Sequence, residues 1–277
     1  MSYKTCLLNI DNEPYSFQVE GDFFWGNDEL LFNENDSLIS KMSWKSDGYA
    51  NVPVFQGNEF HLLKASINEN IIKAIKASGV KIDNKFTLDQ YHKYITTDEL
   101  HNQVINITRN LENEDFNFNI EVLVERFGAI LGYELTSWLE DLGKSHIQIR
   151  ISRPNSLDIN PPHRDGYLSY YHNIINIWIP IEGCNTKSSL PVLPGSHLIN
   201  ENKILRTQSK GAKINGNTYY VPCILEVKDQ PTNMVRPNPK EGEALIFTPY
   251  LIHGAAVNKN EDITRVALEL RFPKIKN

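Results

Sequence analysis

The sequence predicts a mainly β protein in which a barrel-like double sheet is flanked by helices. Three segments alternate between aliphatic and polar residues, namely His146–Ser152, Ile174–Ile181 and Arg265–Phe272. A period of two is typical of strands with one apolar face. A half-exposed antiparallel sheet would give the same pattern, but a face turned to water seldom needs Trp178. We therefore expect the aliphatic faces to pack against helices and the polar faces to line a cavity.

The residues before these strands predict supporting structure more than chemistry. Aliphatic residues recur at helical spacing in Asn68–Ser78 and Ile120–Leu131, which we expect to be helices. Thr136–Leu142 is expected to form another short helix. Such helices would cover the aliphatic face of the larger sheet.

Short extended pieces and loops separate the second and third strands. Tyr219–Val227 and Ala244–Thr248 are expected to be strands. Pro194-Gly195 predicts a turn, which favours a loop-capping or surface role for His197 over metal binding. Asn200–Asn217, rich in Lys, Asn and Gly, is interpreted as a mobile lid over the cavity or as an ordinary surface loop.

The candidate chemistry begins with the triplet His163-Arg164-Asp165. One intervening residue puts the histidine and the aspartate on the same side of an extended strand. Two imidazoles and one carboxylate can occupy one face of an octahedral ferrous ion and leave three positions open. His253 can supply the second imidazole, because the chain between is long enough to return to the same mouth of a small barrel. The triplet alone is weak evidence, since a solvated loop gives the same pattern.

Several further motifs accompany the triplet. They are Asn176-Ile177-Trp178, Leu193-Pro194-Gly195-Ser196-His197, Gly242-Glu243-Ala244-Leu245-Ile246-Phe247, and His253-Gly254 with Asn258 and Arg265. In this combination the chain resembles the phytanoyl-CoA dioxygenase-like branch of the Fe(II)- and 2-oxoglutarate-dependent oxygenases. The resemblance covers about residues 145–272, and more faintly Asp47-Gly48-Tyr49 onward. It implies a double-stranded β-helix core of the jelly-roll, cupin-like type.

The resemblance also suggests how one domain over residues 1–277 is organised. Residues 46–144 would supply a strand and supporting helices, and residues 145–277 the double-stranded β-helix that carries catalysis. Residues 1–45 do not match the family, and we interpret them as an extension, either an added hairpin or an oligomer contact.

The family implies a role for each candidate site residue. His163, Asp165 and His253 would hold Fe(II) as the catalytic centre, and O2 would react there. Arg265 would receive the distal carboxylate of 2-oxoglutarate, because a planar guanidinium binds a carboxylate through two parallel hydrogen bonds. In isolation a salt bridge to a neighbouring acid would explain this arginine equally well. Related halogenases have a small residue in place of the carboxylate ligand, so Asp165 argues against halogenation.

Other polar-face residues are candidates for contacts to the co-substrate. Asn176 or Gln148 could donate a hydrogen bond to one of its carboxylates, and Trp178 could pack against its carbon chain. Core packing is the alternative for Trp178.

The substrate is less well defined. Arg150, Glu269 and Arg271 could hold a charged substrate, although Glu269 and Arg271 are spaced to pair with each other. Tyr167 follows the triplet in a loop that should border the mouth, where tyrosines are also ordinary anchors. The resemblance implies hydroxylation, or another oxidation, of an unactivated C–H bond, and we expect a small polar metabolite, natural product or sugar-type substrate. The alternatives are a cupin-type metal isomerase or epimerase, and a non-catalytic binding protein on the same fold.

Composition agrees with a globular enzyme of small molecules. The chain has 277 residues and a net charge of -6, which argues against nucleic acid or an anionic membrane as a partner. No apolar run approaches the length of a membrane span. The three cysteines are widely spaced, which favours free thiols in a reducing cytoplasm. We expect a cytoplasmic monomer or homodimer.

Overall fold

The computed structural model describes residues 2–109, 111–156, 160–229 and 231–275. Its centre is an antiparallel sheet whose strands pair in the order β4-β14-β8-β15-β7. These strands are β4 (Tyr49–Pro53), β14 (Glu243–Phe247), β8 (Ile174–Glu182), β15 (Arg265–Pro273) and β7 (Ile147–Ser152). The three segments with strict alternation therefore lie side by side in the sheet.

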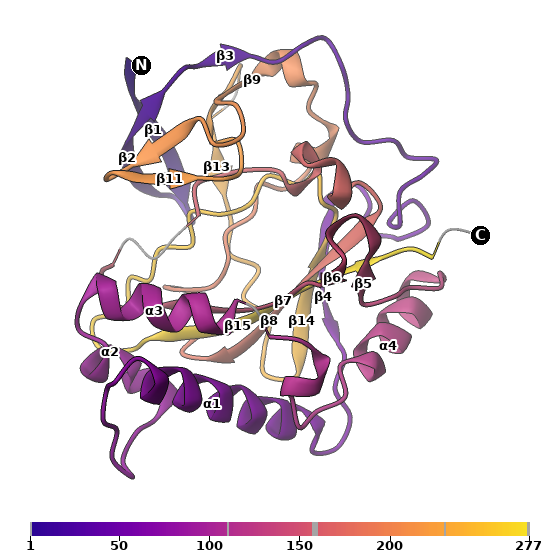
Figure 1. Ribbon diagram of the computed structural model, residues 1–277. Helices are drawn as coiled ribbons and strands as arrows, with labels where there is room; N and C mark the ends of the chain where they lie inside the picture. The colour runs from indigo at the N-terminus through magenta and orange to yellow at the C-terminus, as the bar shows by residue number, and fades with distance from the viewer. Residues whose placement is uncertain (1, 110, 157–159, 230, 276–277) are drawn as a thin grey trace.

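Smaller sheets lie above the main sheet in the view of Figure 1. One has the order β11 (Asn217–Tyr219), β10 (Ala212–Ile214), β2 (Glu13–Gly21), β1 (Ser2–Ile10) and β13 (Asn233–Met234). Another has the order β12 (Ile224–Val227), β9 (Ile204–Arg206) and β3 (Phe24–Trp25), and β5 (Trp138–Leu139) pairs with β6 (Lys144–Ser145). This layering of strands is the mainly β, jelly-roll architecture that the sequence predicts.

Four α-helices cover the other side of the main sheet (Figure 1). They are α1 (Glu59–Ala77), α2 (Tyr91–Tyr94), α3 (Asp98–Thr108) and α4 (Glu121–Leu131). Single 3-10 turns join several elements: η1 (Leu88–Gln90), η2 (Asn113–Asp115), η3 (Glu140–Leu142), η4 (Asp165–Tyr167), η5 (Ser169–Tyr171), η6 (Ser196–Leu198) and η7 (Glu201–Lys203). Among the described residues, no helix combines the length and the apolar composition that crossing a membrane requires.

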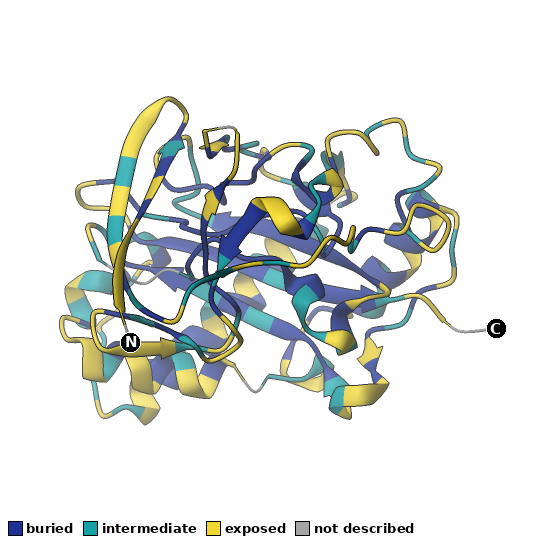
Figure 2. Cartoon of the chain, turned by 90° about the horizontal axis from the view of Figure 1, so that it is seen from above, coloured by how far each residue is buried: buried dark blue, intermediate teal, exposed yellow. Residues whose placement is uncertain are grey.

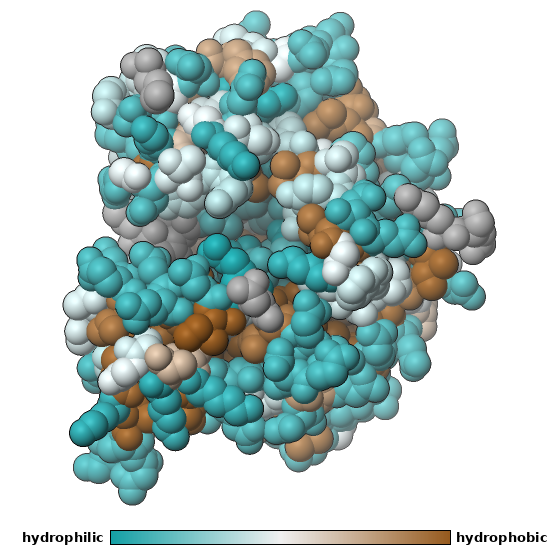
Figure 3. Space-filling model, in the orientation of Figure 1, coloured by the Kyte–Doolittle hydropathy of each residue, from teal (hydrophilic) through white to brown (hydrophobic). Residues whose placement is uncertain are grey.

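The aliphatic strand faces pack against these helices, as predicted. Ile149, Ile177 and Leu268 belong to the same buried cluster as Leu63 of α1 and Phe127 of α4. Seen from above, the main strands are dark blue and buried, whereas exposed residues gather on the helices and the N-terminal hairpin (Figure 2). The face in Figure 3 is mainly hydrophilic, with small separate hydrophobic patches. The main core therefore lies between the sheet and its helices.

Three local predictions need correction. Thr136–Leu142 is not a helix, because Thr136 N donates to Pro273 O (3.0 Å) and so extends the sheet before β5 and η3. Tyr219–Val227 is not one strand, since Pro222 cannot donate to a ladder and the second strand begins at Ile224.

The third correction concerns the segment interpreted as a lid or surface loop. Within Asn200–Asn217, β9 pairs with β12 and β10 pairs with β2, and the side chains of Ile204 and Ile214 are buried. A segment built into two sheets in this way is part of the framework.

Candidate metal centre

His163, Asp165 and His253 meet in the interior, above the polar face of the main sheet. Each offers a ligand atom, and these atoms lie within 4.8 Å of one another. His163 Nε2 is 3.6 Å from Asp165 Oδ1, and His253 Nε2 is 3.7 Å from Asp165 Oδ2. Bonds from a metal to imidazole nitrogen or carboxylate oxygen are about 2.0–2.2 Å long. Atoms at these separations can therefore share one ion.

Backbone pairing brings the two histidine-bearing segments together. His163 N donates to His253 O (2.9 Å) and His253 N donates to His163 O (3.1 Å), which forms an antiparallel bridge. The chain can approach this closely because residue 254 is glycine. A Cβ at Gly254 would lie 2.5 Å from Pro161 O, and its φ of +121° disfavours other residues. The His253-Gly254 motif thus has a structural reason.

Hydrogen bonds fix the orientation of both imidazoles. His163 Nδ1 donates to Pro161 O (2.7 Å) and His253 Nδ1 donates to Leu251 O (3.0 Å). A ring that donates from Nδ1 keeps the lone pair on Nε2, the atom that faces Asp165 in both cases. Metal-binding histidines usually donate their other ring N–H to a carbonyl or carboxylate oxygen in this way.

The electrostatics favour the protonation states that a metal needs. Burial, together with the charge of His163, lowers the pKa of His253 from 6.5 to about 4. Burial alone would raise the pKa of Asp165, but Arg271 and the two imidazoles hold it well below its ordinary value. A neutral imidazole and an ionised carboxylate are the ligand forms that bind metal. The donor set therefore fits a divalent ion such as Fe(II).

Arg271 holds the carboxylate of Asp165 from the side. Its Nη2 is 3.0 Å from both carboxylate oxygens, and its Nε donates to Asn176 Oδ1 at 3.1 Å. Glu269 Oε1 lies 2.5 Å from the same guanidinium, which stacks 4.5 Å from the ring centroid of Tyr171. The alternative that Glu269 and Arg271 pair with each other is thus observed. Arg271 contacts a ligand candidate directly.

Arg265 lies at the other end of the same strand face. It is 4% exposed, is opposite Ser152 in the register of β7 and β15, and donates to Ala256 O at 3.4 Å. Arg265 lies on the same face of β15 as Ala267, Glu269 and Arg271, since alternate residues of a strand share a face. It therefore faces the same interior as the candidate triad, and Ala267 lies between it and Glu269 along that face.

The predicted co-substrate residues differ in their surroundings. Trp178 is 1% exposed and packs with an inner apolar cluster that includes Val192, Leu245 and Ala267. Asn176 is buried, and its Nδ2 has no hydrogen-bond partner within the part of the chain that the structure describes. A buried amide N–H of this kind is costly unless a ligand or water accepts from it. Gln148 is half-buried opposite Glu269.

Two predicted substrate residues have protein partners. Arg150 Nε donates to Glu269 Oε2 (2.6 Å), and its side chain remains 29% exposed. Tyr167 donates its hydroxyl to Glu201 Oε1 (3.2 Å), and the guanidinium of Arg206 lies 4.4 Å from its ring centroid. The environment of Tyr167 corresponds to the anchoring alternative rather than to the mouth.

Sequence reasoning missed His146 as part of this site. Its ring contacts Arg271 Nη1 and accepts from, or donates to, the hydroxyl of Tyr171 at 3.1 Å. The signal was available, because His146 precedes Gln148 and Arg150 at the same period of two. His197, expected to cap a loop or lie on the surface, is buried, and its Nε2 donates to Lys45 O (2.8 Å).

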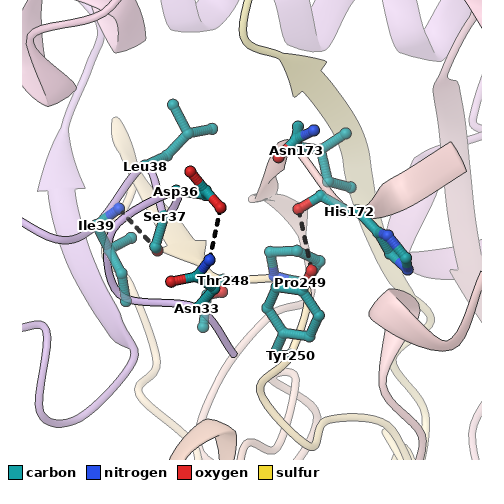
Figure 4. A pocket seen from close by; sticks show the side chains of 11 residues that line it. Asn33, Asp36, Ser37, Leu38, Ile39, His172, Asn173, Thr248, Pro249 and Tyr250 are labelled. Carbon is teal, nitrogen blue, oxygen red and sulfur yellow. Dashed lines mark hydrogen bonds between the residues drawn. The ribbon is translucent and has the colours of Figure 1, made fainter. Parts of the chain in front are cut away.

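A separate cavity of about 240 Å³ is lined by residues from segments that are far apart in sequence (Figure 4). Its lining includes Asn33, Asp36, His172 and Tyr250, whereas no triad residue lines it. A Cβ at Gly166 would lie 2.5 Å from the ring of Tyr250, so this ring packs directly against the backbone next to Asp165. The cavity is a neighbour of the metal centre and not part of it.

Several solved structures of low sequence identity match the chain over most of its length. EvdMO1 is 18% identical, with a TM-score of 0.51, and the match covers 100% of this chain and 56% of that chain. EctD from S. alaskensis with 2-oxoglutarate and 5-hydroxyectoine is 16% identical (TM-score 0.47, covering 93% and 84%). The epimerase SnoN in complex with Fe3+, alpha ketoglutarate and nogalamycin RO is 14% identical (TM-score 0.46, covering 83% and 80%).

Comparison of sequences is more specific. No curated protein matches the chain. The profile of the phytanoyl-CoA dioxygenase (PhyH) family, however, matches residues 44–267, which include all three ligand candidates and Arg265. The protein therefore belongs to the phytanoyl-CoA dioxygenase (PhyH) family, whose enzymes are 2-oxoglutarate-dependent non-haem iron oxygenases.

Proposed function

We propose that this protein hydroxylates, or otherwise oxidises, an unactivated C–H bond of a small polar metabolite, natural product or sugar-type substrate. The observation that supports this most directly is the buried triad, in which both Nε2 atoms face an ionised Asp165. When bound, Fe(II) with 2-oxoglutarate and O2 supplies the oxidising power, and 2-oxoglutarate leaves as succinate and CO2. The contribution of the protein is to hold these groups and the C–H bond in place.

His163, Asp165 and His253 would be the metal ligands. Three protein ligands on one face leave the other coordination positions to small molecules. Asp165 is negative and the two imidazoles supply neutral nitrogen, so the ligand set reduces the charge of a divalent ion only in part. A bidentate anion such as 2-oxoglutarate can then complete the neutralisation.

Arg265 would bind the distal carboxylate of 2-oxoglutarate. Its guanidinium is buried, so a carboxylate there meets a charged donor that water screens poorly. Asn176 Nδ2 would donate to a carboxylate oxygen near the metal, which would satisfy a buried N–H. Trp178 would pack against the carbon chain, and Gln148 would contribute a further polar contact from β7.

The substrate would approach the charged residues of the inner face. Arg150 is the most accessible of them, because its side chain is 29% exposed while Glu269 holds its Nε. Glu269 and Arg271, which pair with each other, would influence the substrate through Arg150, because Glu269 binds that side chain. Tyr167 would contact the substrate only if its hydroxyl left Glu201. Charged and hydrogen-bonding groups of this kind favour a polar substrate over a long hydrocarbon.

The test begins with the purified protein and ferrous ion under anaerobic conditions. We expect 2-oxoglutarate to bind only when the metal is present, and O2 then to yield succinate, faster with a true substrate than without one. A panel of amino acids, sugars and aromatic natural products would identify the class. Metal binding with no succinate under any condition would instead favour an isomerase or a binding protein.

The role of Arg265 has its own prediction. Arg265→Gln should weaken 2-oxoglutarate binding at least about 10-fold, because a hydrogen bond to a charged group contributes about 1.5–3 kcal/mol. Arg265→Lys keeps the charge but loses the two parallel hydrogen bonds of the guanidinium, so its affinity for 2-oxoglutarate should lie between those of Arg265→Gln and the wild type. Affinity for the metal alone should not change in either protein. Equal 2-oxoglutarate affinities in all three would exclude this role for Arg265.

A further inference from the structure

Arg164, the middle residue of the triplet, is fully buried although it contacts no proposed ligand side chain. Its exposed fraction is 0%, and only Trp178 among fully buried side chains is larger in the described part of the chain. Along extended chain, neighbouring side chains point to opposite sides. Arg164 therefore leaves the backbone on the side away from His163 and Asp165, and its role must be sought there.

Behind the metal centre, the guanidinium of Arg164 enters the segment that carries the Leu193–His197 motif. It bonds the carboxylate of Glu201 and the carbonyl oxygen of Ser196, and Nη2 also donates to Ile199 O at 3.2 Å. Glu201 is itself 0% exposed, so this is an ion pair between two fully buried groups. A pair of this kind is costly to leave half-made, which fixes the geometry of its members.

The same segment also holds the arm that carries His253. The hydroxyl of Ser196 accepts from Ile252 N at 2.8 Å, and Leu193 N donates to Ile252 O at 2.8 Å. Ile252 precedes His253 directly. Ser196 thus touches both ligand arms, because its carbonyl accepts from Arg164 and its hydroxyl accepts from Ile252.

We propose that Arg164 and Ser196 are positioning residues that set the separation between the His163–Asp165 arm and the His253 arm. This inference rests on the proposed metal ligands. In front, backbone hydrogen bonds join the two arms: those of the bridge between His163 and His253, one from Gly166 N to Pro249 O (2.8 Å) and one from Ala255 N to Asn160 O (2.7 Å). The contacts through Ser196 join the arms from behind as well, and they include the side chains of Arg164 and Ser196. Attachment on both sides would hold the three ligand atoms on one face of an ion.

The experiment uses variants that remove the contacts through Ser196 from behind. Arg164→Met combined with Glu201→Met replaces the buried ion pair by apolar side chains of similar volume, a change that is often neutral for stability. Because Glu201 also accepts from Arg206 Nε (3.1 Å) and from the hydroxyl of Tyr167 (3.2 Å), the stability of this variant is measured beside its metal affinity. Ser196→Ala removes only the hydroxyl. Mn(II) and Co(II) titrations give the metal affinity, the visible absorption of bound Co(II) gives the coordination geometry, and thermal unfolding gives the stability.

Two matched controls separate positioning from general stability. Arg126→Met with Glu59→Met removes a partly exposed arginine–glutamate ion pair (2.5 and 2.7 Å) between α4 and the start of α1. Ser66→Ala removes a buried hydroxyl that accepts from Asn117 N at 2.8 Å. Neither control touches a ligand arm.

We expect the double variant at Arg164 and Glu201 to bind Mn(II) about 10- to 100-fold more weakly than wild type, the range seen when residues that orient metal ligands are removed. Ser196→Ala should lose less Mn(II) affinity, and its Co(II) absorption spectrum should change in the same direction as that of the double variant. Both controls should keep the wild-type affinity and spectrum even where their unfolding temperature falls.

Folded Arg164 and Ser196 variants with the affinity and spectrum of wild type would overturn the inference. If the double variant does not fold, Ser196→Ala with its Ser66→Ala control decides the question alone. Failure of the proposed metal ligands themselves would look different, because His253→Ala would then bind Mn(II) as tightly as the wild type does.

Discussion

The two faces of β15 bury different kinds of side chain, one aliphatic and the other largely charged. On one face, Val266, Leu268 and Leu270 are 0% exposed and pack towards the helices. On the other, Arg265, Glu269 and Arg271 point into the space between the sheets. Burial of aliphatic side chains stabilises the fold at every pH and without any ligand. Burial of charged groups costs free energy unless they are paired or bind something. The contrast separates a face of β15 that stabilises the fold from a face whose buried charges need partners or a ligand.

The charged and polar groups of the inner face find only some of their ion-pair and hydrogen-bond partners among themselves. Asp165, Arg271, Glu269 and Arg150 form a chain of ion pairs of alternating sign. This chain of ion pairs leads from Asp165, a candidate metal ligand, to Arg150, whose side chain is 29% exposed. At the other end, Asn176 Nδ2 is buried without a partner in the described part of the chain. The inner face therefore combines self-neutralised charges with donors suited to a ligand.

The largest effect is expected from the inner side, at His253. His253→Ala should weaken metal binding by more than about 100-fold, since even outer-shell losses cost 10–100-fold. Succinate formation should fall with it. The fold should persist, because the aliphatic face is untouched. Isothermal titration with Mn(II) and thermal unfolding measure the two properties on the same sample.

The matched control for this variant is His61→Ala, on an exposed residue of α1. It should bind metal as the wild type does. If His253→Ala bound metal as tightly as the wild type, the inner face would not hold the metal site, and the two faces would not differ in function.

The next effect concerns the aliphatic face. Leu268→Ala should lower the free energy of unfolding by about 2–5 kcal/mol, the range for a buried leucine that leaves a cavity. The metal affinity of the folded protein should stay at the wild-type value. Urea unfolding followed by circular dichroism, with a metal titration in buffer, measures both.

Leu62→Ala provides the comparison for a leucine that is 51% exposed on α1. Its effect should stay within about 0.5 kcal/mol, as for most surface substitutions. A fall in metal affinity in Leu268→Ala that matched its loss of stability would mean that the two faces are not independent.

The sequence predicts the two-faced strands and the metal ligands for the same reason. A period of two shows directly which residues share a face, so the separation of Ile149 from Arg150 needed no tertiary information. The His163-Arg164-Asp165 spacing is likewise local. His253 was accessible because it stands in a motif with a glycine that the backbone requires.

Pairings between distant segments could not be read in this way. The bond between Arg271 of β15 and Asp165 of η4 joins segments that are distant in sequence, so it depends on the folded structure. Thr136–Leu142 looked helical because its apolar spacing fits 3.6 residues, whereas the hydrogen bond from Thr136 N to Pro273 O and the pairing of β5 with β6 make its first half sheet. Likewise, the framework role of residues 200–217 depends on β2 and β3, which lie far away in sequence.

The smallest effect, and the one most specific to the charged face, is a dependence of stability on pH through His146. Burial, with the neighbouring charge of Arg271, lowers the pKa of His146 from 6.5 to about 4. Between these values the unfolded chain binds a proton that the folded protein does not. Stability therefore increases with pH across this window, is complete above about pH 6.5 and is lost as the pH falls towards 4.

His146→Gln should reduce this dependence, because glutamine cannot take up the proton. Between pH 6 and pH 5 the wild type should lose up to about 1.4 kcal/mol more than the variant, the equivalent of one proton over one pH unit. Leu268→Ala should instead shift the whole stability curve down by the same amount at every pH, because no ionisable group changes. Urea unfolding of the metal-free proteins at both pH values measures the difference. Equal slopes for wild type and His146→Gln would mean that the buried imidazole is protonated in the folded state, and that the inner face holds one more positive charge beside Arg271 than the network in this structure can accommodate.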